Sequence, residues 1–186
     1  MDIQFGLNLV AGALFVIFLG AIAWIAVRWS RSRRLKKKFG TEYDYLVNTL
    51  GDRGKAETEL ELREKHADEL NVHPLDDDVQ ERYLFEWNSL QNKFVDRPLD
   101  VVIKADRLIN EVMVARGFPI GNFEERVANI SILYPDIVTN YRKAWEIVRK
   151  NEPNEASTKD LRLAMLCYRS LLDELLVSDD IRVKEK

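Results

Sequence analysis

Cysteine and histidine are scarce in this 186-residue chain, and each shortage excludes a class of site. Cys167 is the one cysteine, so an intrachain disulfide and a cysteine-built metal centre are both impossible. The two histidines, His66 and His73, lack a glutamate three residues earlier, so the Glu-x-x-His signature of a di-iron bundle is absent. We assign no catalytic, metal-binding or cofactor-binding residue and expect no cofactor, which weighs against an enzyme without excluding one.

Strand-like patterning is also missing. No segment alternates apolar and polar residues over the length of a strand, so the pattern predicts an all-α fold. Proline is rare and interrupts none of the apolar-periodic segments, as expected where it separates helices. The five prolines are Pro74, Pro98, Pro119, Pro135 and Pro153.

Net positive charge is confined to one short stretch. Residues 1–27 carry −1 and residues 28–38 carry +7, which leaves −9 of the total −3 charge for residues 39–186. Affinity for phosphate backbones is built from Lys and Arg, so the acidic part argues against a nucleic-acid partner.

One long apolar run is present at the N-terminus. Residues 3–27 form 25 residues without a charge, and residues 9–27 are apolar throughout. As helix these two stretches would be about 37 and 28 Å long, which brackets the hydrocarbon core of a bilayer at about 30 Å. The run predicts a single membrane-spanning helix.

The flanks of this run predict its orientation. Seven cations follow it within eleven residues, whereas only Asp2 and the amino terminus precede it. The positive-inside rule therefore predicts a single pass through the cell (inner) membrane, with an outside N-terminus and a cytoplasmic domain. We interpret the cations mainly as a topology signal, with anionic-lipid binding as a further possibility. The membrane-interface residues are Trp24, Arg28, Trp29, Arg31, Arg33, Arg34, Lys36, Lys37 and Lys38.

A cleaved signal peptide is the alternative, because Ala21-Ile22-Ala23 resembles a small-x-small cleavage site. It would leave an exported domain. A signal peptide carries its positive charge before the apolar core, whereas this chain carries it after, so we favour a retained anchor.

The whole chain is predicted to divide into four parts. Residues 1–38 form the anchor with its basic segment, and residues 39–75 are predicted to form a charged helical stalk. A heptad register there runs from Phe39 to Ala67 but also includes Arg53, Glu57 and Glu64, so a strict coiled coil is not expected. Gly51 and Gly54 favour a break in the helix.

Residues 76–178 are predicted to form a compact helical bundle, and residues 179–186 a disordered tail. The clearest helix is the last, whose apolar residues follow helical spacing almost without error. These residues are Leu161, Ala164, Met165, Tyr168, Leu171, Leu172, Leu175 and Leu176.

A tyrosine followed by an arginine occurs in two predicted helices. Tyr141 with Arg142 and Tyr168 with Arg169 could line a polar pocket, although structural support for the fold is the favoured role. Cys167 lies beside the last apolar stripe, where a free cysteine is usually a small core residue.

Several long blocks carry a resemblance to a known family: FGTEYDYLV, YLFEWNSLQNKFVDRP, ADRLINEVMVARGFP, FEERVANISILYPDIVTNYRKAWEI and YRSLLDELL. They resemble uncharacterised bacterial proteins that have an N-terminal membrane segment. The resemblance implies no activity, cofactor or site residue.

The sequence thus favours a membrane-anchored, cytoplasmic helical module that binds another protein. A small-ligand sensor or an enzyme with a site between helices is the alternative, and self-association is left open. The sequence identifies neither partner nor ligand.

Overall fold

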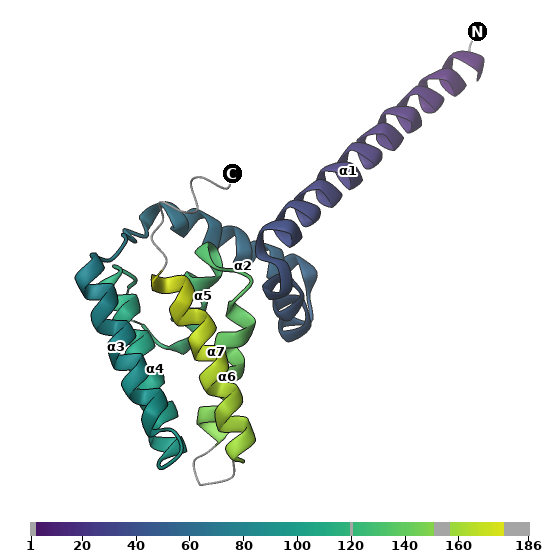
Figure 1. The fold of residues 1–186 in the computed structure, drawn as a ribbon. Helices are drawn as coiled ribbons and strands as arrows, with labels where there is room; N and C mark the ends of the chain where they lie inside the picture. The colour runs from purple at the N-terminus through teal and green to yellow at the C-terminus, as the bar shows by residue number, and fades with distance from the viewer. Residues whose placement is uncertain (1–2, 120, 151–156, 177–186) are drawn as a thin grey trace.

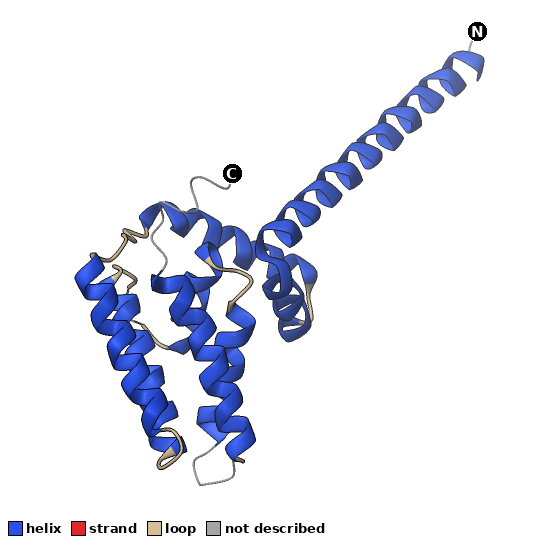
Figure 2. Cartoon of the chain, viewed as in Figure 1, coloured by secondary structure: helices blue, strands red, loops and turns tan. Residues whose placement is uncertain are grey.

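The structure, a computed structural model, describes residues 3–119, 121–150 and 157–176. The described residues form seven α-helices and one short 3-10 helix joined by loops, and they contain no β-strand (Figure 2). The predicted all-α fold, with a long apolar N-terminal helix followed by a helical bundle, is confirmed. The predicted tail, residues 179–186, lies outside the described residues.

The first helix, α1 (Ile3–Leu50), projects from the rest of the molecule as a long rod (Figure 1). In the apolar stretch of this helix, Phe18 and Trp24 are 61% and 63% exposed. By length and composition, this one helix of the described residues could cross a membrane.

The backbone of α1 leaves helical geometry at Gly40, where φ is +49° and ψ is −122°. Residues with a Cβ rarely adopt a positive φ, so glycine is suited to this position. The break predicted at the next glycines is found at Gly51, which also has a positive φ, whereas Gly54 lies in the first turn of α2. The chain therefore changes direction twice after the apolar stretch.

The second helix, α2 (Arg53–His66), packs against α1, and a short 3-10 helix, η1 (Ala67–Glu69), follows it. Residues 39–75 are thus largely helical, as predicted for a stalk, but they do not form a single rod. The predicted boundary after Lys38 lies between Leu35 and Phe39, which are both fully buried in one apolar cluster. The cluster contains Leu35, Phe39, Tyr43, Leu46, Ala56 and Leu60.

Five helices form the bundle: α3 (Asp77–Lys93), α4 (Pro98–Ala115), α5 (Phe123–Leu133), α6 (Val138–Lys150) and α7 (Thr158–Leu176). Helix α7 packs against both α4 and α6, and α3 packs against α4 (Figure 1). All eight residues of the predicted apolar stripe on α7 are buried, so that prediction is confirmed. Trp87 of α3 and Ile109 of α4 are fully buried in the same core.

Local hydrogen bonds fix where these helices begin and end. Asn122 and Glu125 form a capping box at the start of α5. Ser157 and Asp160 form another at the start of α7, where the amide of Asp160 donates to the Ser157 hydroxyl. Gly117 ends α4 through the two backbone bonds of a Schellman motif.

Candidate functional site

A buried charge network joins the long N-terminal helix to the bundle. Glu42 of α1 is 1% exposed and accepts hydrogen bonds from two arginines. One carboxylate oxygen lies 2.8 Å from Nη1 of Arg63 on α2 and 2.9 Å from Nη2 of Arg142 on α6. Arg142 also donates to the second oxygen over 3.3 Å. One carboxylate therefore ties three helices together.

Further polar groups complete this network. Arg63 donates to the hydroxyl of Ser131 on α5 and to Glu59 on its own helix. Arg142 pairs with Glu124 of α5, and its guanidinium lies 4.0 Å from the ring centre of Tyr45. Burial alone would lower the pKa of Arg142, but its bonds to the two carboxylates raise that pKa above its ordinary value. Each buried charge of this network therefore has an oppositely charged partner. We call the contact of Glu42 with Arg63 and Arg142 the joint.

A second buried carboxylate lies where α2 crosses α1. Glu57 is 3% exposed and accepts hydrogen bonds from Ser32 and from Tyr43 and Arg53 at 2.9 and 3.0 Å. Burial alone would raise the pKa of Glu57, but the three hydrogen bonds outweigh it and lower the pKa. This carboxylate is therefore held in its charged form as a structural group.

The structure divides the tyrosine and arginine residues that were proposed to line one pocket. Tyr141 and Tyr168 come together in the core, with ring centres 6.4 Å apart. Arg142 instead joins the network of Glu42, and Arg169 pairs with Asp173 along α7. The structure therefore brings together the two tyrosines but not the two arginines.

Each core tyrosine has its own polar partner. The hydroxyl of Tyr168 donates to Asp106 of α4, and the hydroxyl of Tyr141 accepts from Arg126 of α5, both over 2.9 Å. Burial raises the pKa of Tyr141 to about 12, although the Arg126 hydrogen bond acts in the opposite direction. Burial raises the pKa of Tyr168 as well. Both groups are neutral members of the core at pH 7.

This pKa predicts a loss of stability at alkaline pH. Tyr141 titrates near 10 when exposed and near 12 in the fold, so the folded state holds its proton longer than the unfolded state. The contribution is present below pH 10 and lost as the pH rises to 12, by about 3 kcal/mol.

The measurement is the free energy of unfolding of the full chain in detergent, by circular dichroism, between pH 9 and pH 12. Tyr141→Phe is expected to start lower, because the Arg126 bond is lost, but to fall less steeply. An equal slope in both proteins would contradict the prediction.

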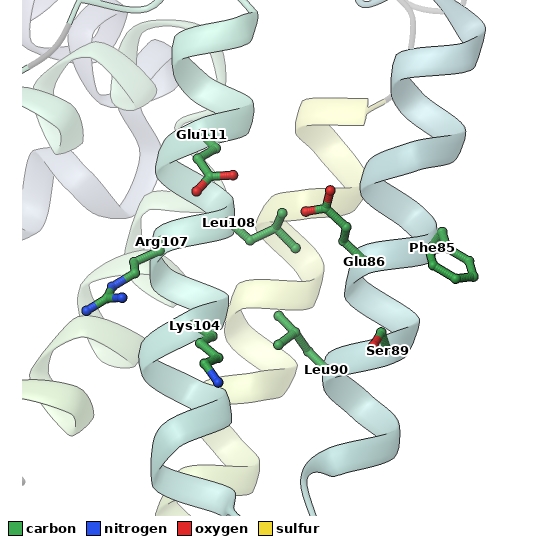
Figure 3. A pocket seen from close by; sticks show the side chains of 8 residues that line it. All are labelled: Phe85, Glu86, Ser89, Leu90, Lys104, Arg107, Leu108 and Glu111. Atoms are coloured by element: carbon green, nitrogen blue, oxygen red, sulfur yellow. The ribbon is translucent and has the colours of Figure 1, made fainter.

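The bundle surface carries a groove between α3 and α4, with a volume of about 310 Å³. In Figure 3, Leu90 and Leu108 point toward each other across its floor, and Phe85 lies on the outer side of α3. Phe85 is 75% exposed, which is unusual for a large aromatic ring. Glu86 and Glu111 lie toward one end, and Lys104 and Arg107 toward the other.

Histidine and cysteine are common catalytic and metal-binding residues, and this chain has His66, His73 and Cys167. His66 and His73 are both exposed, and no group of three or more His, Cys, Asp or Glu there could hold a metal ion. Cys167 is buried, and burial raises the pKa of its thiol, which lowers its reactivity. These features fit a structural role for Cys167.

Comparison with known proteins gives no match: no family model, curated protein or solved structure is significantly similar to this chain. The joint around Glu42 and the groove between α3 and α4 are therefore the features that bear on function.

Glu42 and Phe85 were not assigned to a site from the sequence. Phe85 nevertheless carried a signal, since it lies two residues from both Tyr83 and Trp87 and therefore on the opposite face of α3. Glu42 carried a weaker one, because it shares a helix face with Phe39 and Leu46.

Proposed function

We propose that this chain is a membrane-anchored domain that binds another protein through the groove between α3 and α4. The observation that carries the proposal is the apolar floor formed by Leu90 and Leu108, together with Phe85, which is 75% exposed on the outer side of α3. Exposed apolar surface rimmed by charges is typical of protein interaction sites. The apolar part of α1 supplies the anchor, and the cations after it support a cytoplasmic domain.

In this proposal, the buried joint connects the membrane anchor to the helices that form the groove. Glu42 fastens α1 to α6, α6 packs on α7, and α7 packs on α4, which forms one wall of the groove. Breaking a buried ion pair is costly, so this connection resists bending. The anchor would then hold the groove at a defined place beside the membrane.

The partner chemistry follows from the groove. Its floor takes apolar side chains, its acidic end takes Lys or Arg, and its basic end takes Asp or Glu. An amphipathic helix presents such a combination along one face, as in other helix-in-groove complexes. We therefore propose an amphipathic helix of a partner protein as the occupant.

Photocrosslinking in intact cells tests this function. The full-length chain carries a photoreactive benzoylphenylalanine at Phe85, or at Leu166 of α7 as the matched control, since Leu166 is 64% exposed. We expect a crosslinked species with Phe85 replaced and none with Leu166 replaced. The crosslinked peptide, sequenced by mass spectrometry, is expected to be an amphipathic helix carrying both charges.

Equal crosslinking at both positions, crosslinking at Leu166 alone, or none at either would contradict the groove as the binding site. Phe85→Ala provides the second check. An exposed substitution usually changes the free energy of unfolding by less than about 0.5 kcal/mol, so the variant should stay folded while the crosslink from a probe at neighbouring Ser89 is lost.

The proposed orientation makes a separate prediction. Val95 is 87% exposed and Cys167 is buried, so Val95→Cys adds one reactive thiol over a low background. A membrane-impermeant maleimide should label this variant only after the cells are lysed. Gln4→Cys should be labelled in intact cells, because the N-terminus is proposed to lie outside. The reverse pattern would overturn the orientation, and loss of the N-terminal residues from the mature protein would support the exported alternative.

A further inference from the structure

The seven cations that follow the apolar stretch fall into two sets in the structure. Four of them contact carboxylates: Arg31 with Glu61 at 2.7 Å, Arg34 and Lys38 with Glu64 at 3.1 and 3.0 Å, and Lys36 with Asp44 at 2.8 Å. Arg28, Arg33 and Lys37 contact no carboxylate within the described residues. Within the described residues, three of the seven cations are therefore available to bind a ligand outside the chain.

Two of these cations form a row with a tryptophan. Trp29, Arg33 and Lys37 are spaced four residues apart, which places them one above another on a single helix face. All three are exposed, and the guanidinium of Arg33 lies 5.8 Å from the ring centre of Trp29. The opposite face carries Leu35, which is buried against α2. The row therefore points away from the protein.

The position of the row indicates its ligand. The uncharged stretch ends at Val27, so Trp29 begins the row where the apolar part of α1 gives way to charge. Tryptophan is enriched at this level of a membrane, and a guanidinium binds phosphate oxygens through paired hydrogen bonds. We infer that Trp29, Arg33 and Lys37 bind the headgroups of anionic phospholipids, whereas Arg31, Arg34 and Lys38 serve to hold α2.

This inference rests on the proposed membrane anchor, and it makes a sharper statement than general attraction to a basic segment. A cation near an anionic surface favours binding by roughly fivefold. If all seven cations acted alike, any two of them could be removed with the same effect. The structure instead assigns that effect to the row.

The experiment compares two double variants of the full chain with equal charge changes on the same helix. The full chain and its variants are reconstituted in nanodiscs of phosphatidylcholine, alone or with phosphatidylglycerol, and the lipids that stay bound after release are counted by native mass spectrometry. Arg33→Gln with Lys37→Gln removes the row, and Arg34→Gln with Lys38→Gln is the control, since these two cations contact Glu64.

We expect the row variant to lose its preference for phosphatidylglycerol by roughly 25-fold, from two cations at roughly fivefold each. The control should keep most of the preference. An equal loss in both variants, or no loss in the row variant, would overturn the inference. Failure of the unaltered chain to enter discs of phosphatidylcholine alone would instead overturn the membrane anchor, so the two failures are distinguishable.

Discussion

Replacing Glu42 by glutamine is expected to lower the free energy of unfolding by about 3–5 kcal/mol. The substitution removes the only charge that lies between Arg63 and Arg142 in the described network, and both guanidinium groups are buried. Two cations would then stay in a low-dielectric site with a neutral amide between them. The measurement is urea unfolding of the full chain in detergent, followed by circular dichroism.

Glu64→Gln is the matched control for this prediction. Glu64 also bridges two cations, Arg34 and Lys38, but its side chain is 24% exposed rather than 1% as for Glu42. Ion pairs exposed to water contribute about 0–1 kcal/mol. Similar losses from both substitutions would show that burial of the joint does not decide its contribution.

An apolar replacement of the whole joint separates stability from coupling. Glu42→Leu combined with Arg63→Met and Arg142→Met removes all three buried charges of this network, so stability should return close to that of the unaltered chain. If the joint also holds the groove in place, the crosslink from Phe85 should weaken in this triple variant although the domain is folded. That outcome would assign the joint a role in positioning.

The elements of this fold were readable from the sequence because their signals are local. The apolar run from residue 3 to residue 27, the stripe on α7 and the stop at Gly117 each depend on residues within a few turns of one another. Helical periodicity and end signals act over the same distance. The all-helical fold therefore followed from pattern alone.

The joint could not be predicted in the same way, because Glu42 and Arg142 are 100 residues apart. A charge on an apolar helix face carries no information about which distant cation will cover it. The charged positions that interrupt the register after Phe39 did carry some information, since Glu57 and Glu64 both contact the basic segment of α1. Charged residues at these heptad positions thus indicated polar contacts between α1 and α2.

The bend at Gly40 was missed for a related reason. Apolar residues at Phe39 and Tyr43 continue the helical register across it, so the pattern contains no interruption there. The positive φ of Gly40 appears only once the chain has to turn toward the bundle. Tertiary packing, rather than local preference, selects this conformation.

Alanine at Gly117 is expected to cost about 3 kcal/mol of the free energy of unfolding, from a strained φ and a steric clash together. Gly117 has φ +88°, and a Cβ there would lie 2.3 Å from the carbonyl oxygen of Asn71. That oxygen belongs to the segment after η1, which cannot move freely because His73 and Arg116 exchange hydrogen bonds of 2.9 Å in both directions. Thermal and urea unfolding of the full chain measure the loss.

Gly51→Ala separates the two contributions. Gly51 also has a positive φ, of +64°, but a Cβ there would meet nothing within 4 Å. This control should therefore cost only the backbone strain, about 1–2 kcal/mol. An equal loss at both positions would mean that the segment around Asn71 yields to the added methyl group. A larger loss at Gly117 would instead show that the segment around Asn71 is held rigidly against the end of α4. Arg116 contributes to this rigidity, because it also donates to the carbonyl oxygen of Leu175 at the end of α7.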